Sequence, residues 1–202
     1  MPRNTSIALA LVAALAASSA HADGFKATLG YENVNPKSDN GQLAGATARV
    51  SDDWAATGSL AYGFTDNFSA ELWTGLNKYE HDVAIDGLGT VARLQHRPTT
   101  LSLNYHFLPA GKVNPFVGVG YGWVNVSGEE GLGALSGTTI RAENGNGVSF
   151  TVGADIALTD KFFLRGSARK LNFDSDVTVN GAGVGTANVD PWVYGLSAGL
   201  NF

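Results

Sequence analysis

The sequence of 202 residues contains no cysteine. No disulfide therefore braces the fold, and neither thiol chemistry nor a thiolate metal site is available. Basic residues are also scarce, and the formal net charge of −5 argues against nucleic acid as a partner. Long hydrophobic runs are missing as well, since the apolar run at residues 7–17 is shorter than the roughly 20 residues of a spanning helix. These absences exclude a disulfide scaffold and a helical membrane protein.

The first residues, "MPRNTSIALALVAALAASSAHA", have the features of a secretory signal peptide. A basic start at Arg3 is followed by the apolar run and by the small-x-small sequence Ala20-His21-Ala22. We therefore predict a signal peptide at residues 1–22 and a single exported domain at residues 23–202.

The remaining sequence has the period-two pattern of β-strands, with no convincing helical periodicity. In the last segment, "DPWVYGLSAGLNF", large apolar residues from Trp192 to Phe202 alternate with small or polar ones. Eight segments of this kind are predicted, at residues 25–32, 54–64, 68–77, 100–107, 117–123, 148–158, 162–169 and 192–202. One face of each strand is apolar, and the other is small or polar.

Two folds fit this alternation, a soluble β-sandwich and a membrane β-barrel with its apolar face turned to lipid. The connections at 65–67, 108–112 and 159–161 are short, whereas those at 33–53, 78–93, 127–146 and 174–189 are long and rich in Gly, Asn and Asp. Such alternation is typical of outer-membrane barrels, which have short periplasmic turns and long extracellular loops. We therefore predict an all-β fold, an eight-stranded antiparallel transmembrane β-barrel in the outer membrane with both termini periplasmic.

Aromatic residues gather near both ends of the predicted strands, as expected for belts at the two membrane–water boundaries. Phenylalanines mark the periplasmic side, at positions 25, 64, 68, 107, 116, 162 and 202, and Trp54, Tyr79, Trp123 and Trp192 mark the other. Phe116 is an exception, because its parity turns it inward if Val117 faces lipid.

An eight-stranded barrel encloses a lumen only just wide enough for side chains. The inward glycines, including Gly118 and Gly120, either leave room for a narrow passage or ease strand curvature. The inward charges should pair and plug the lumen, with a selectivity filter as the alternative; they are Lys26, Glu32, Glu71, Asp155, Arg165 and Arg169, with His106 nearby. Trp73, which is also inward, is either a filler or part of an apolar constriction.

The sequence gives little sign of an enzyme or a metal site. A nucleophile needs a base within hydrogen-bond reach, and no spacing links His81, His96 or His106 to a particular serine. His81 lies in the run "KYEHDVAIDG", which we interpret as a solvated loop. We predict no catalytic residues, metal or cofactor, and we keep a lipid A-modifying enzyme as a distant third reading.

Two stretches, "RLQHRPTTLSLNYHFLPAGKVNPFVGVGYGW" and "VDPWVYGLSAGLNF", resemble the OmpW family of eight-stranded outer-membrane proteins. Pro98-Thr99-Thr100-Leu101 matches the family's strand start with one extra Thr. The run from Pro115 to Gly120 matches its Pro-Phe/Tyr-Val-Gly-x-Gly strand, and Asp190-Pro191-Trp192 with Phe202 matches its closing motif. The likeness covers essentially the whole exported chain.

The resemblance implies a narrow, partly hydrophobic interior through which small, mainly apolar solutes cross the outer membrane. We expect Trp73, Gly118, Gly120, Arg165 and Arg169 to line the path. Arg169 stands where enteric relatives have an inward aromatic residue, which weakens the case for a purely hydrophobic solute. Pro98 marks either a lateral exit, because proline loosens strand pairing, or simply the first residue of its strand.

The terminal Phe202, with Leu200 and Tyr194, resembles the signal read by the barrel assembly machinery. The other expected partners are outer-membrane lipid, lipopolysaccharide and small apolar solutes. The alternative function is a structural barrel with a plugged lumen, whose loops bind a partner at the cell surface. The identity of the solute, the gate and the oligomeric state are not indicated by the sequence.

Overall fold

The computed structural model describes residues 24–202, and the predicted signal peptide lies outside them. The strands are β1 (Phe25–Asn35), β2 (Gln42–Leu43), β3 (Ala46–Val50), β4 (Asp53–Gly63), β5 (Phe68–Gly75), β6 (Tyr79–Ile85), β7 (Gly89–His106), β8 (Val113–Gly131), β9 (Ile140–Ala142), β10 (Gly145–Ala157), β11 (Phe162–Leu171), β12 (Asp174–Val179), β13 (Ala182–Asn188) and β14 (Trp192–Asn201), with one 3₁₀ turn, η1 (Gly133–Leu135). No helix in this part of the chain is long and apolar enough to cross a membrane.

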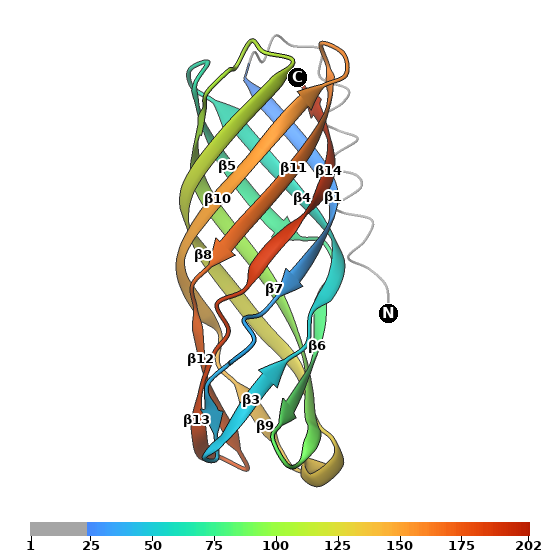
Figure 1. Ribbon diagram of the computed structural model, residues 1–202, viewed down its shortest axis with the longest axis vertical. Coiled ribbons are helices and arrows are strands. Elements are labelled where there is room, and N and C mark those ends of the chain that lie inside the picture. The colour runs from blue at the N-terminus through green and yellow to red at the C-terminus, as the bar shows by residue number, and fades with distance from the viewer. Residues whose placement is uncertain (1–23) are drawn as a thin grey trace.

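The long strands form a closed antiparallel barrel in the order β1-β4-β5-β7-β8-β10-β11-β14, and β14 pairs back onto β1. The predicted eight-stranded barrel is therefore confirmed. The C-terminus and the short turns lie at one end, at the top of Figure 1, and Phe202 N donates to Phe25 O at 2.9 Å. We call this the periplasmic end and the opposite one the extracellular end, as the loop lengths predict.

Side-chain exposure confirms the predicted faces of the strands. The outward residues are exposed: Leu29 by 49%, Phe150 by 53% and Leu196 by 73%. An exposed aliphatic and aromatic band of this kind is stable only against lipid. Phe116 does face inward, as its parity requires, and with 1% exposure it does not belong to the periplasmic aromatic belt.

The long connections are mostly strands rather than loops, which corrects the sequence-based prediction. The β7 strand has 18 residues and β8 has 19. At about 3.3 Å per residue each spans roughly 60 Å, whereas a tilted membrane strand needs only about 9–11 residues. The barrel wall therefore continues well beyond the membrane on the extracellular side.

Shorter strands complete this extension at the bottom of Figure 1. The first part of β7 pairs with β6, and β6 pairs with β3. A separate sheet has the order β13-β12-β9. The extension forms because "YEHDVAI" also alternates with period two, which places Tyr79, His81, Val83 and Ile85 on its buried face.

Candidate functional site

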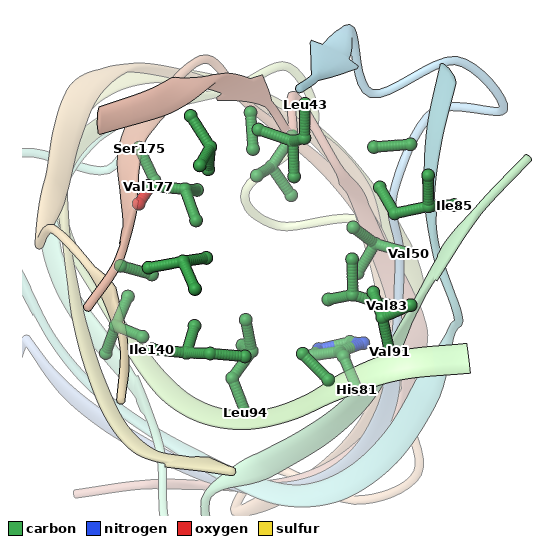
Figure 2. Close-up of a pocket in the computed structure, with 18 of the residues that line it drawn as sticks. Leu43, Val50, His81, Val83, Ile85, Val91, Leu94, Ile140, Ser175 and Val177 are labelled. Carbon is green, nitrogen blue, oxygen red and sulfur yellow. The ribbon is translucent and has the colours of Figure 1, made fainter. Parts of the chain in front are cut away.

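The extracellular extension encloses an apolar cavity of about 230 Å³. Figure 2 shows its wall, with Leu43, Val83, Ile85, Leu94, Ile140 and Val177 among the labelled residues. Most of the side chains belong to β2, β3, β6, β7, β8, β9, β12 and β13, and none of the lining residues is an acid, a lysine or an arginine. Exposed Ala44 and Leu88 lie on its rim. The cavity forms because the inward positions of these strands are mostly Val, Leu, Ile and Ala, held apart by the sheet.

Two buried histidines, His81 on β6 and His96 on β7, provide most of the polar lining. His81 Nδ1–H donates to the carbonyl oxygen of Ser51, so the Nε2 of a neutral His81 accepts from His96 Nε2–H at 2.7 Å. His96 Nδ1 has no partner among the described residues. Burial lowers the pKa of His81, and it holds the pKa of His96 well below its usual value.

These positions correct the interpretation of residues 78–93 as a solvated loop. With 1% exposure, His81 is buried rather than solvated. The pair is closed below by Tyr79, whose ring lies 5.6 Å from that of His96 and nearly parallel to it. With 0% exposure, Tyr79 does not belong to the aromatic belt in which the sequence placed it.

A buried apolar layer lies beneath the histidines and separates the cavity from the membrane-spanning interior. Its members are Val34, Ala55, Trp73, Tyr79, Val124, Leu171, Phe173 and Val193. Phe173 and Val124 also line the cavity above. Each member of the layer is at most 6% exposed.

Paired charges fill the barrel below this layer. Arg165 forms ion pairs with Asp155, at 2.7 Å, and with Glu71; Arg169 forms one with Glu71 at 3.0 Å. Lys26 adds a contact to Asp155 at 3.6 Å. These partners confirm the predicted pairing for the inward charges other than Glu32. Glu32 instead accepts hydrogen bonds from neutral side chains, those of Thr57, Trp73 and Ser197. Among the described side chains at this level, no gap is large enough to hold a water molecule.

Aromatic rings cover the guanidinium groups of both arginines. Trp73 lies 4.3 Å from the Arg169 guanidinium carbon, and Phe116 lies 4.6 Å from that of Arg165. Such contacts stabilise a cation that has lost its water. Trp73 therefore stands at the boundary between the apolar layer and the charged layer.

The five residues expected to line the solute path lie in or below this boundary rather than around the cavity. Trp73, Arg165 and Arg169 belong to the closed layers. At Gly118 an added Cβ would come within 2.0 Å of Asn104 Oδ1, and at Gly120 within 2.3 Å of Leu101 O. Neighbouring atoms therefore occupy the space that the absent side chains leave.

Pro98 lies in the middle of β7, so it does not mark the first residue of its strand. The β5–β7 ladder ends at the pair Thr74–Thr99, and the β6–β7 ladder begins at Tyr79–His96. Between them, Arg97 and Pro98 have no ladder partner on this side. A proline is tolerated there because the position needs no ladder hydrogen bond.

The gap in pairing adjoins a groove on the lipid-facing surface. This groove has a volume of about 350 Å³ and extends across β11, β14, β1, β4 and β5. The residues at its floor have small side chains or none; they include Gly58, Ala198 and Gly199. Leu76 lines the end of the groove that lies next to the gap in strand pairing. Tyr79 closes the inner side, since a Cβ on Gly75 would lie 3.3 Å from its ring.

The structure also brings His106 together with a serine, which the sequence could not do. His106 Nε2 lies 3.1 Å from Ser69 Oγ, and its Nδ1 lies 3.2 Å from Asn114 Nδ2. These are residue types of a nucleophile, a base and an orienting group. All three are buried inside the barrel, and none of the cavities described above includes them.

The residues expected to act in assembly lie on or beside the last strand. Tyr194 is exposed on the lipid-facing side, Leu200 is half-buried, and Phe202 follows the end of β14. Their part in recognition by assembly machinery remains a prediction.

The chain is similar to known outer-membrane proteins over its whole described length. A family model with the description OmpW family matches residues 24–202. Outer membrane protein W of Vibrio cholerae is 27% identical, over 99% of this chain and 100% of its own length. Outer membrane protein AlkL of Ectopseudomonas oleovorans is 29% identical, over 80% of this chain and 72% of its own length. The crystal structure of OprG from Pseudomonas aeruginosa shares the fold, with a TM-score of 0.78 and 24% identity over 90% of this chain and 97% of that one.

Proposed function

The chain belongs to the OmpW family of outer-membrane β-barrels, and we propose that it takes up small, mainly apolar solutes through the cavity at its extracellular end. The observation that carries this proposal is the uncharged lining of that cavity. A dry apolar cavity of about 150 Å³ already binds benzene. At about 230 Å³, this one has room for a somewhat larger hydrocarbon.

We propose further that the solute leaves sideways, near Pro98, rather than through the lumen. The charged layer below Trp73 has no free space among the described side chains, and moving its ions apart would expose unpaired charge. The gap in pairing at Pro98 leads towards the apolar groove on the lipid side. In this scheme Tyr79 moves to open the exit, while Trp73 is the floor that turns the solute aside.

The predicted path through Trp73, Gly118, Gly120, Arg165 and Arg169 remains the axial alternative to this exit. Liposomes separate the two routes. Axial passage delivers a polar solute to the interior of the vesicle, and lateral exit delivers only an apolar solute to the bilayer.

We propose no enzymatic role, because the Ser69–His106–Asn114 arrangement is buried away from the cavity. A second candidate function, a structural barrel that binds a partner through its extracellular end, is favoured by the closed charged layer. Solute uptake requires an empty cavity, whereas binding of a partner by a structural barrel does not.

Filling the cavity tests the uptake proposal. Ala92→Phe places a ring in the cavity, whereas Ala70→Phe places the same ring on the lipid-facing side of β5. Transfer of an apolar fluorescent dye, such as a naphthylamine, into protein-containing liposomes should fall at least tenfold with Ala92→Phe and stay unchanged with Ala70→Phe. Equal transfer by both variants and by empty liposomes would leave the structural barrel as the better reading.

The exit is tested at Gly75. Gly75→Ala adds a methyl group 2.9 Å from Asn77 O and 3.7 Å from Pro98 Cδ, so it narrows the gap. The control, Gly166→Ala, adds the same group where its nearest neighbour lies at 3.6 Å. Slower dye release to the bilayer with undiminished binding in the cavity is expected for Gly75→Ala alone. If both variants release dye at the wild-type rate, the exit lies elsewhere.

A further inference from the structure

We propose that a polar groove on the outer wall of the barrel binds neutral sugars of the lipopolysaccharide core. The groove has a volume of about 570 Å³ and lies where β10, β12 and the segment before β14 meet. It is lined by residues that include Asn144, Asn146, Asn172, Asp174, Asn188 and Asp190. It shares only Phe173 with the lining of the apolar cavity, and the inference does not depend on solute uptake.

The height of the groove on the barrel points to lipopolysaccharide. Asn146 pairs directly with Trp123, and Trp192 pairs with Lys170, the last outward residue of β11. Both tryptophans are exposed and lie at the extracellular ends of lipid-facing surfaces. Exposed tryptophans of this kind mark the membrane–water boundary. The groove therefore begins just outside the hydrocarbon, where the sugars of the outer leaflet lie.

The groove faces away from the barrel axis. Asn144 and Asn146 are exposed on the same side of the chain as the lipid-facing Val148, and Asn172 is exposed on the neighbouring wall. Gly145, which is buried between the exposed Asn144 and Asn146, also lines the groove and packs closely against the wall beneath it. A Cβ there would lie 2.4 Å from a ring carbon of Phe173, which is turned inward.

Hydrogen-bonding capacity remains free on several carboxamides. Asn144 Oδ1 accepts from Val126 N at 2.8 Å, and Asn146 Oδ1 accepts from the Tyr121 hydroxyl. These bonds leave the Nδ2 groups of both residues available. The Asn172 carboxamide has no hydrogen-bond partner among the described residues. Together they provide N–H donors for the oxygens of a ligand.

The one lysine that lines the groove is already paired, and one of the groove's carboxylates keeps its charge. Lys37 pairs with Asp190 at 2.9 Å, and Asp174 accepts from Asn188 at 2.7 Å. Lys170 donates to the backbone oxygen of Asp190. The lining cation, Lys37, is therefore not free to hold a phosphate, whereas the carboxylates can still accept from hydroxyl groups. A lining of carboxamide donors in which two carboxylates outnumber one lysine fits a neutral sugar better than an anion.

Free core oligosaccharide, released from lipopolysaccharide without its lipid A, is the probe that tests the groove. Wild-type protein in detergent micelles should bind it saturably in calorimetric titrations. Because each lost hydrogen bond weakens binding by up to about tenfold, Asn146→Ala combined with Asn172→Ala should weaken it at least tenfold. Asn77→Ala, an exposed asparagine on the β5–β6 connection outside the groove, should leave it unchanged.

Asn172→Ala alone guards against a folding defect, since it removes no side-chain hydrogen bond of the protein, and it should weaken binding about threefold. Inorganic phosphate should not compete. The proposal is overturned if wild-type protein does not bind the oligosaccharide saturably, or if the double variant binds it as tightly as wild type. Displacement of the oligosaccharide by millimolar phosphate would also overturn it, because the groove would then be an anion site.

Discussion

The two halves of this barrel have opposite interiors although the long strands β7 and β8 run through both. The membrane-spanning half is filled with ion pairs, and the extracellular half is apolar and hollow. In the first half, long charged side chains reach across the lumen and meet. In the second, short aliphatic side chains cannot reach across, and the hydrogen-bonded wall prevents collapse. The contrast shows that side-chain length and charge decide whether such a barrel is closed or open inside.

The largest effect should come from breaking the charged layer. Glu71→Ala removes the carboxylate shared by Arg165 and Arg169 and leaves the two guanidinium groups facing each other. An uncompensated buried charge of this kind costs about 3–5 kcal/mol. Urea unfolding in liposomes, followed by tryptophan fluorescence, measures the loss. A change below about 1 kcal/mol would mean that water reaches this layer.

Truncating a side chain in each half compares packed and hollow interiors directly. Phe116→Ala opens a void beneath the Arg165 guanidinium, and such a change costs about 3–5 kcal/mol. Leu94→Ala enlarges a cavity that already exists. The free energy of unfolding should therefore fall only by the contribution of the apolar surface that the leucine buries, about 1–2 kcal/mol. The same unfolding measurement applies to both. Equal losses would show that the extracellular cavity is filled in the folded protein.

The buried histidines should make the extracellular half sensitive to acid. Their pKa values are lowered in the folded protein, while an unfolded histidine has a pKa of about 6.5. Below that pH the unfolded chain takes up protons that the folded chain does not, so the free energy of unfolding falls. The slope is at most about 1.4 kcal/mol per pH unit for each histidine.

Unfolding between pH 6.5 and 5, compared with the double variant His81→Gln and His96→Gln, checks this dependence. The variant should lose the histidine part of the slope. An identical slope in both proteins would assign the acid response to carboxylates instead.

The smallest effect is expected at the exposed ion pair of Arg49 and Asp86 on the extracellular extension. Both side chains are about half exposed, at 58% and 49%. Surface pairs contribute from zero to about 1 kcal/mol. Arg49→Gln should therefore shift the unfolding midpoint only slightly, and added salt should reduce the shift further. A loss as large as that of Glu71→Ala would remove the distinction between buried and exposed pairs.

Much of the barrel follows from the sequence because period-two alternation fixes which side chains face outward. Leu29, Phe150 and Leu196 are lipid-facing for this reason, and the inward parity of Phe116 was also readable. The extracellular extension was missed, although Tyr79, His81, Val83 and Ile85 alternate as well. Residues 78–93 were predicted to be a loop because of their Gly and Asp content. They contain β6, which pairs with the first part of β7.

The sequence by itself determined the sheet, its lipid-facing surface and the sign of the charges inside it, because these depend on neighbouring residues along one strand. Only the tertiary structure decided that Glu71 lies between Arg165 and Arg169, 94 and 98 residues away. It also decided that valines and leucines from strands between β2 and β13 surround one cavity. Contacts across a lumen depend on strand tilt and stagger, which set the heights at which side chains meet and leave no local trace in the sequence.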